Sequence, residues 1–284
     1  MNGLQIQNTE MLEVINRTEI DMQIATAKRY PRDLPTVLRR IRESATEDSS
    51  VAQECFYALP RDGKNIEGLS VRMAEIMAGA WGNLRVQTRI IGNDGKTITA
   101  QGICHDLETN TAVSVEVKRS IIDKKGNTYS ENMQVTTGNA ASAIAFRNAV
   151  LKIIPKAVTN KTIEEVKKVA IGSTKDLKTR REGCIASFVA KGISQDVLLS
   201  YLEIERIEDI DSEMLFNLAG LYNSIKEGMI TIEEIFGEVS QKQQGKTALE
   251  KAKAAKAKAM QAAQRQASAQ VVDAEIIDDK GGNL

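Results

Sequence analysis

The segment LRVQTRIIGNDGKTITAQGICHDLETNTAVSVEVKRS, residues 84–120, alternates apolar and polar side chains in three runs. Its first two runs are separated by Gly92-Asn93-Asp94-Gly95, and glycine beside asparagine or aspartate is typical of a tight hairpin turn. A second turn falls within residues 107–111. Three alternating strands joined by short turns predict an antiparallel β-meander with one apolar face and one polar, cationic face.

A helix rich in alanine follows and can cover the apolar face of this sheet. Residues 139–154 read NAASAIAFRNAVLKII, and Pro155 ends the helix because proline lacks the amide donor that a helix needs. Upstream, residues 9–29 and 34–47 are expected to form helices. A strand is expected at residues 55–59, and a further helix after Ser70, a good N-cap residue.

Acidic and basic residues are unevenly distributed along the rest of the chain, although the formal net charge is zero. Residues 183–240 carry 3 basic and 11 acidic side chains and show only helical patterns, which indicates a small acidic helical domain suited to docking a partner. A basic helical linker is expected at 161–182, after an α+β core at 1–160. Residues 241–284 are dominated by Ala, Lys and Gln and are expected to be disordered. The predicted fold class is α+β: an antiparallel β-meander packed by a long Ala-rich helix, then a small all-α domain and a disordered tail.

Composition excludes several kinds of chemistry. His105 is the only histidine, so a His-rich metal site is excluded, and we expect no metal, no cofactor and no catalytic residues. The three cysteines form no C-x-x-C pair, which favours a reducing compartment and a role as small buried hydrophobes. No secretory leader and no apolar run of about 18 residues occurs, which predicts a cytoplasmic protein without a membrane segment. Neither Gly92–Thr97 nor the Gly245-Lys246-Thr247 segment has the spacing of an ATP-binding loop.

A magnesium-dependent nuclease is one alternative. Asp106 ends one predicted strand, and Glu116 and Lys118 lie two residues apart on the next, an arrangement that can hold Mg²⁺ and orient a water molecule. Glu75 is a candidate for a further ligand. The same residues are also ordinary on the solvated face of a strand.

A basic set is the other constellation, and its residue types suit a phosphate backbone. Arg85 and Arg89 share a strand face, with Lys118 on the equivalent face nearby. Arg147 falls on the apolar stripe of its helix, so it requires a carboxylate such as Glu116 or an anionic ligand. The candidate DNA-binding residues are Arg85, Arg89, Lys118, Arg119, Lys124, Lys125, Arg147, Asn148 and Lys152.

Three segments carry a resemblance to a known family: CFYALPR, EGLSVRMAEI and GNAASAIAFRNAVLKIIP. Their order around the meander resembles the single-strand annealing proteins of bacteriophages, the RecT, Redβ and Erf superfamily. The stretch from LSYLEIERIEDI to MITIEEIF is similar to the helical domain that often follows such cores.

The resemblance implies an ATP-independent recombinase that coats single-stranded DNA as a homo-oligomeric ring or filament and anneals complementary strands. By position, Arg147 and Lys152 match the basic residues of the family's DNA-binding helix. A phage exonuclease or a host single-strand-binding protein is the implied partner. A non-enzymatic adaptor that uses the acidic helices and binds no DNA is the remaining alternative.

Overall fold

The three-stranded meander is confirmed by the computed structural model, which describes residues 2–61, 64–123, 125–172, 177–237 and 239. The strands are antiparallel and lie in the order β3-β4-β5. In the β3–β4 turn, a carboxylate oxygen of Asp94 accepts hydrogen bonds from the amides of Lys96 and Thr97. The strands are β3 (Leu84–Asn93), β4 (Thr97–Asp106) and β5 (Thr111–Ser120).

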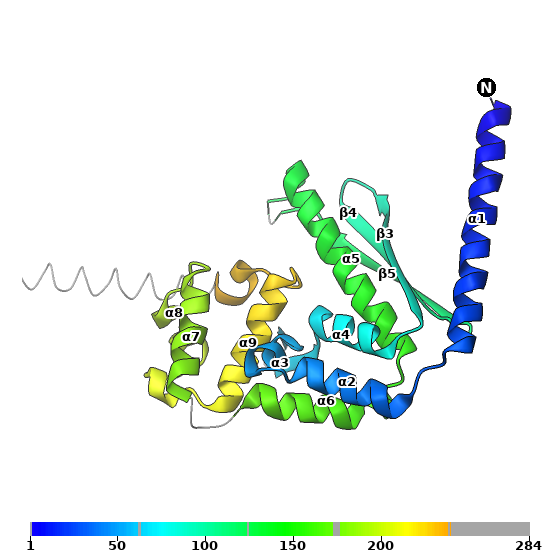
Figure 1. The fold of residues 1–284 in the computed structure, drawn as a ribbon. Helices are drawn as coiled ribbons and strands as arrows, with labels where there is room; N and C mark the ends of the chain where they lie inside the picture. Colours follow the sequence, from blue (N-terminus) through cyan, green and yellow to red (C-terminus); the bar gives the residue numbers. More distant parts are fainter. Residues whose placement is uncertain (1, 62–63, 124, 173–176, 238, 240–284) are drawn as a thin grey trace, which may run out of the picture.

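Helix α5 (Glu131–Ile153) covers one face of this sheet (Figure 1). It begins eight residues before the predicted start and ends, as expected, just before Pro155. The closest approach is at Gly102 of β4, where an added Cβ would lie 2.3 Å from the carbonyl oxygen of Ala145. Small side chains therefore allow the helix to lie directly on the strand, as the alanine content predicted.

Four helices and a β-hairpin precede the meander in the described chain. Helices α1 (Asn2–Arg29) and α2 (Leu34–Ala45) are separated at residues 30–33, and Asp33 caps α2 by accepting a hydrogen bond from the amide of Thr36. Ser70 caps α4 in the same way, through the amide of Met73. The remaining elements are α3 (Ser49–Glu54), the hairpin of β1 (Phe56–Arg61) and β2 (Lys64–Leu69), and α4 (Val71–Trp81). Strand β2 was not predicted.

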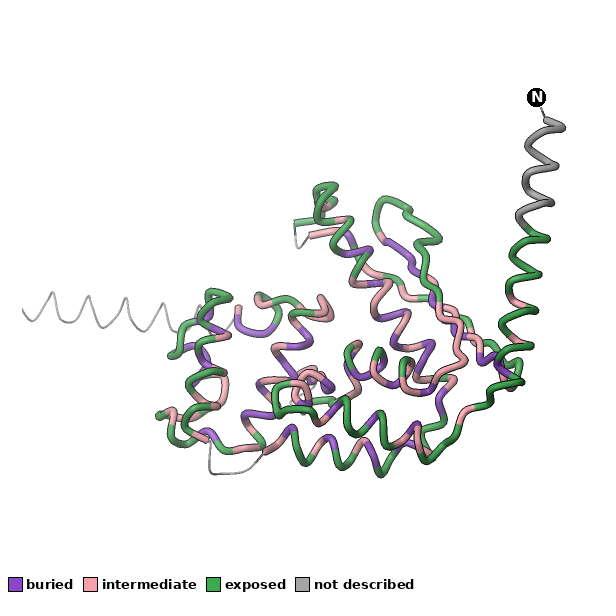
Figure 2. Tube along the Cα trace, viewed as in Figure 1, coloured by how far each residue is buried: buried purple, intermediate pink, exposed green. Residues whose placement is uncertain are grey.

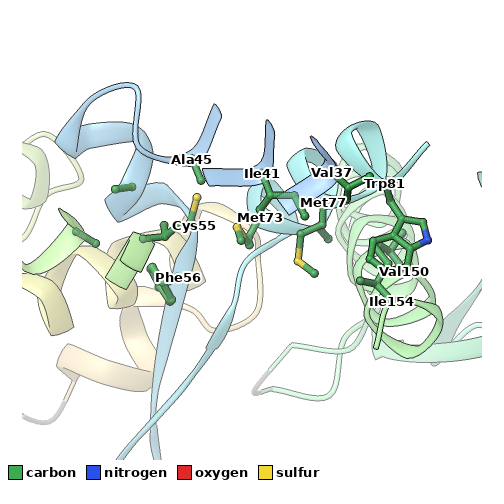
Figure 3. Close-up of a cluster of buried hydrophobic side chains, with 14 of the residues drawn as sticks. Val37, Ile41, Ala45, Cys55, Phe56, Met73, Met77, Trp81, Val150 and Ile154 are labelled. Atoms are coloured by element: carbon green, nitrogen blue, oxygen red, sulfur yellow. The ribbon is translucent and has the colours of Figure 1, made fainter. Parts of the chain in front are cut away.

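The first hydrophobic core lies between α2, α4, α5 and α6 (Figure 3). Ile41, Met73 and Val150 are fully buried in it. Helix α6 (Lys156–Ile171) contributes Val166 and Ala170 to the same core, so residues 161–171 pack on the body of the protein. This differs from the predicted linker at 161–182, because the apolar side of α6 is buried against α2 and α3.

A second core holds the C-terminal helices together and includes Phe188, Leu198 and Phe236. The helical character predicted for residues 183–240 is confirmed. The elements are α7 (Leu177–Val189), α8 (Gln195–Tyr201), the 3-10 turn η2 (Ile207–Asp209), α9 (Ser212–Lys226) and a helical turn at 232–237. The expected disordered tail, 241–284, lies outside the described residues.

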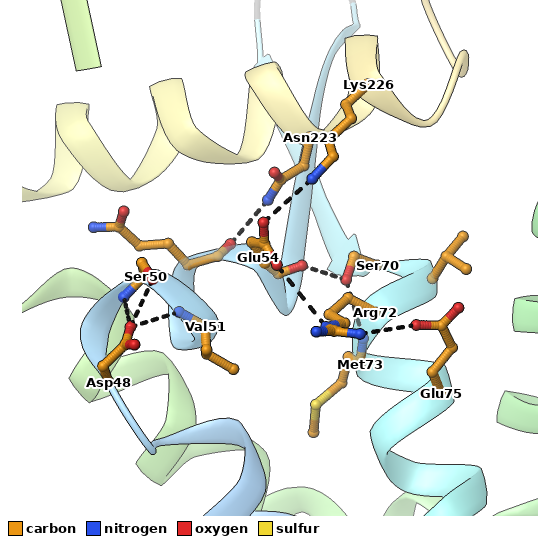
Figure 4. Close-up of polar contacts among 12 residues, drawn as sticks. Asp48, Ser50, Val51, Glu54, Ser70, Arg72, Met73, Glu75, Asn223 and Lys226 are labelled. Carbon is orange, nitrogen blue, oxygen red and sulfur yellow. Dashed lines mark hydrogen bonds and ion pairs between the residues drawn. The ribbon is translucent and has the colours of Figure 1, made fainter. Parts of the chain in front are cut away.

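Helix α9 joins the two cores. Its Phe216 is buried in the first core, and Gly220 lies so close to β1 that an added Cβ would be 2.9 Å from the amide nitrogen of Ala58. Figure 4 shows the polar side of this contact, where Asn223 donates to the carbonyl of Gln53 and Lys226 pairs with Glu54. The acidic helices are thus fixed directly to the N-terminal core.

Burial accounts for the raised pKa values of the three cysteine thiols. All three are free thiols, with Cys55 and Cys104 buried and Cys184 half-buried. Burial raises the pKa of Cys55 to about 12 and the pKa of Cys104 and Cys184 to about 11. Within the part of the chain that the structure describes, no helix combines the length and apolar character needed to cross a membrane.

Candidate nucleic-acid interface

The face of the meander opposite α5 carries three of the predicted cations. Strand alternation and pairing register place Arg85 opposite His105, Arg89 opposite Gln101, and Lys118 opposite Thr99, all on this face. Arg89 and Lys118 are exposed, and Arg85 is half-buried. We call Arg85, Arg89 and Lys118 the basic face. Among the described strand residues on this face, one is acidic: Glu116, opposite Gln101.

Side chains around the basic face hold its arginines in place. The guanidinium of Arg89 donates to Gln101 Oε1 over 2.9 Å, on the neighbouring strand. Arg85 donates to Gln23 Oε1 of α1 over 3.1 Å, so the last turns of α1 border the face at one end. A guanidinium has five N–H groups, and each of these bonds uses only part of that set. With respect to the described part of the chain, the remaining donors of Arg85 and Arg89 are available to an anion.

Arg119 lies on the other side of the sheet. Its guanidinium donates to the carbonyl oxygens of Gly228 and Met229, just after the end of α9. Burial lowers the pKa of Arg119, although nearby Glu234 opposes the shift. These contacts make Arg119 a tie between β5 and α9, and they separate it from the basic face.

Arg147 is buried, as its place on the apolar stripe of α5 predicted. Its guanidinium lies 4.8 Å from the ring centroid of Tyr57, donates to Asn148 Oδ1, and is 3.8 Å from a carboxylate oxygen of Glu227. The suggested partner, Glu116, is wrong, because it lies on the opposite face of the sheet. Burial raises the pKa of Glu227 despite its hydrogen bond from the amide of Val71 and the charge of Arg147.

The other described lysines among the candidates lie outside the strands that carry the basic face. Lys152 is exposed near the end of α5, and Lys125 is exposed in the turn after β5, where its amide donates to Asp123 Oδ1. Lys124 lies outside the described residues. The structure therefore brings together three of the nine candidate residues on one sheet face.

A cleft of about 1000 Å³ adjoins the basic face beyond the edge strand β5. The cleft is lined by three of the candidate cations, Lys118, Arg119 and Lys125. Tyr129 and the acidic Glu233 and Glu234 line it as well. Tyr129 is half-buried and lines this cleft, where a nucleic-acid base could stack on its ring. Trp81 is buried, and the ring of Tyr57 lies under Arg147.

The carboxylates of the nuclease alternative are not assembled. Asp106 is buried and accepts two hydrogen bonds from Arg32, of 2.6 and 2.7 Å. It lies on the face of the sheet opposite to Glu116, while Glu75 is 3.4 Å from Arg72 on α4. Within the described ranges, no group of three His, Cys, Asp or Glu side chains could hold a metal ion.

Arg32 is a residue that sequence reasoning missed. Its guanidinium lies 4.9 Å from the ring centroid of Trp81 and also contacts Glu108 at 3.0 Å. The sequence shows only a single arginine in the break between two helices at 30–33. The residues around it do not indicate that its partner is Asp106, 74 residues away. Arg32 fixes the end of β4, and thereby the position of the meander.

No protein-family model, no curated protein and no solved structure matches this chain, so its function is inferred from its own residues.

Proposed function

We propose that the protein binds single-stranded DNA through the basic face and anneals complementary strands without ATP. The observation that supports this most is the position of Arg85, Arg89 and Lys118 on the sheet face that α5 leaves uncovered. Arg85 and Arg89 are four residues apart on one strand, about 13 Å by the usual rise of a strand, so they reach separate phosphates. Contacts of this kind bind without reading the base sequence.

Annealing needs no fuel, because base pairing supplies the free energy. A protein that neutralises the phosphates and leaves the base edges exposed lowers the repulsion between two strands and allows pairing. The chain's one glycine-lysine-threonine sequence within the described residues, Gly95-Lys96-Thr97, supports this passive mechanism. It forms a strand turn in which Asp94 accepts from the amides of Lys96 and Thr97, so these amides are not free to bind phosphate.

Weak contacts per copy become tight binding when the copies assemble on one strand, so we propose a homo-oligomer as the working form. The acidic helices, with 11 acidic and 3 basic side chains over 183–240, repel DNA and are proposed to dock a protein partner of the recombination machinery. We propose a cytoplasmic site of action, as part of bacteriophage-type recombination.

Salt dependence tests the binding step. Three phosphate contacts per protomer predict a log–log slope of affinity against salt of about −2 on a single strand. Fluorescence anisotropy of a labelled oligothymidine, short enough to hold one protomer, measures this slope. A flat response, or no binding at low salt, contradicts the proposal and leaves the adaptor as the better description.

A further inference from the structure

Tyr30 is a large aromatic side chain that the structure leaves in solvent at the end of α1. It is 64% exposed, whereas the other tyrosines in the described part of the chain are half-buried. Figure 2 shows the last turn of α1 and the break after it as largely exposed. Single exposed aromatic residues are common on protein surfaces, so the setting of Tyr30 decides whether it has a function.

The backbone of Tyr30 is held on both sides of the residue. Its amide donates to the carbonyl of Thr26 over 3.0 Å, and its carbonyl accepts from Asn83 Nδ2 over 2.9 Å. Pro31 follows, with its φ angle fixed by the proline ring, and Arg32 is anchored in the buried ion pair described above. A tyrosine ring on a fixed backbone has only two side-chain torsions left to order, so it binds a flat ligand at little entropic cost.

Tyr30 lies beside the Arg85 end of the basic face. Asn83, its hydrogen-bond partner, precedes Arg85 by two residues, which is at most about 7 Å along the chain. Arg85 in turn donates to Gln23 of α1, so two contacts place the end of α1 at this end of the basic face. Figure 1 shows α1 and α5 on different sides of the meander, so the end of α1 is clear of the helix that covers the other face of the sheet.

We propose that Tyr30 stacks on a base of bound single-stranded DNA while Arg85 holds a neighbouring phosphate. The guanidinium of Arg29 lies over the Tyr30 ring, 5.7 Å from the ring centroid, so the base takes the other face of the ring. Aromatic side chains stack on every base, because every base has a π-face. Stacking uses the flat face of the base and leaves its Watson–Crick edge free to pair with a second strand.

This inference rests on the proposed function and adds to it a residue that selects single strands. The cations of the basic face bind phosphates, which single strands and duplexes both carry. An aromatic ring beside them favours a strand whose bases are free to stack on it. In a duplex the bases are already stacked on one another, so the Tyr30 ring gains no contact there.

Two strands of equal length test the stacking step: oligothymidine, and a backbone of abasic sites that keeps the phosphates and lacks the bases. Tyr30→Ala is expected to bind oligothymidine about tenfold more weakly than the unchanged protein, with the same salt slope, since no phosphate contact is lost. Both proteins are expected to bind the abasic strand alike. Tyr30→Phe keeps the ring and should bind oligothymidine like the unchanged protein, as should Leu34→Ala, the control at a 42% exposed position on α2.

The emission of Tyr30→Trp gives a second measurement, which decides the case if Tyr30→Ala does not fold. Oligothymidine is expected to quench this emission, and the abasic strand is expected to leave it unchanged. Trp81 is buried and contributes a constant background, which Ile66→Trp, at a 45% exposed position on β2, measures as the control.

Fluorescence anisotropy gives the affinities, and circular dichroism checks that each variant is folded. Oligothymidine binding that Tyr30→Ala leaves unchanged overturns the proposal, as does an equal loss on the two strands or a loss in Tyr30→Phe as large as in Tyr30→Ala. If the unchanged protein binds neither strand, the proposed function fails and this inference fails with it. Binding by the unchanged protein with no effect at residue 30 defeats this inference alone.

Discussion

A variant with Arg85→Gln, Arg89→Gln and Lys118→Gln is expected to bind single-stranded DNA about 100-fold more weakly than the unchanged protein at about 0.1 M salt. Each phosphate contact on a single strand contributes about 0.7 to the log–log slope, so three contacts account for about two powers of ten at this salt concentration. The log–log slope of affinity against salt concentration should change from about −2 to near zero. Anisotropy titrations of the two proteins over a range of salt measure both quantities.

The control carries the same chemical change elsewhere. Arg40, Lys156 and Lys191 are exposed cations on α2, on α6 and in the turn after α7, away from the basic face. Their combined change to glutamine removes the same net charge and is expected to lower the affinity by less than a factor of about five, since long-range attraction between exposed charges is screened by salt. Equal losses in the two triple variants would show that overall charge, and not the basic face, governs binding.

Asp106→Ala is expected to lower the free energy of unfolding by about 3 kcal/mol, because it leaves the buried Arg32 guanidinium without its main counter-charge. The side chains of Arg32 and Asp106 are 9% and 6% exposed, so water cannot replace the lost carboxylate. This expected loss lies at the lower end of the range usual for breaking a buried ion pair, because Glu108 still contacts Arg32 at 3.0 Å. Urea unfolding measures the difference, with Glu43→Ala, in an exposed pair with Arg39, expected to cost about 0.5 kcal/mol at most.

The same ion pair gives stability a defined dependence on pH. Burial acts to raise the pKa of Asp106, but hydrogen bonds and charge from Arg32, with the amides of Glu108 and Thr109, bring it below the ordinary value of 3.8. A depressed pKa in the folded state stabilises the protein at pH values above the unfolded pKa, and this stability is lost as the pH falls through the folded pKa. The stability gap between the unchanged protein and Asp106→Asn should therefore be constant near neutral pH and narrow below about pH 4. A gap that stays constant into acid contradicts this account of the pair.

Local signals in the sequence predicted the meander and its covering helix. Strand alternation, the Asn93-Asp94-Gly95 turn, the Ser70 cap and the stop at Pro155 each depend on neighbouring residues, and each is confirmed. The same alternation placed Arg85, Arg89 and Lys118 on one face, because every second residue of a strand points the same way.

Partners distant in the sequence could not be predicted. Arg147 was expected to be buried and is, but Glu227 and Met229 contact it from about 80 residues away, across the end of α9. Arg119 looked like a free cation at the end of a strand, and only the packing of α9 shows that it binds the carbonyl of Met229. The predicted domain boundary at residue 160 lies inside helix α6 for a related reason. The sequence shows that α6 has an apolar side, but it does not show which surface that side will cover.

The most direct test of the central claim is the rate at which two complementary oligonucleotides anneal, followed by energy transfer between dyes on their ends, in buffer without any nucleotide. The unchanged protein is expected to accelerate annealing, with no further gain when ATP is added. The Arg85→Gln, Arg89→Gln, Lys118→Gln variant is expected to return the rate to that of DNA alone. Annealing that the unchanged protein does not accelerate, or that the triple variant accelerates equally well, contradicts the account.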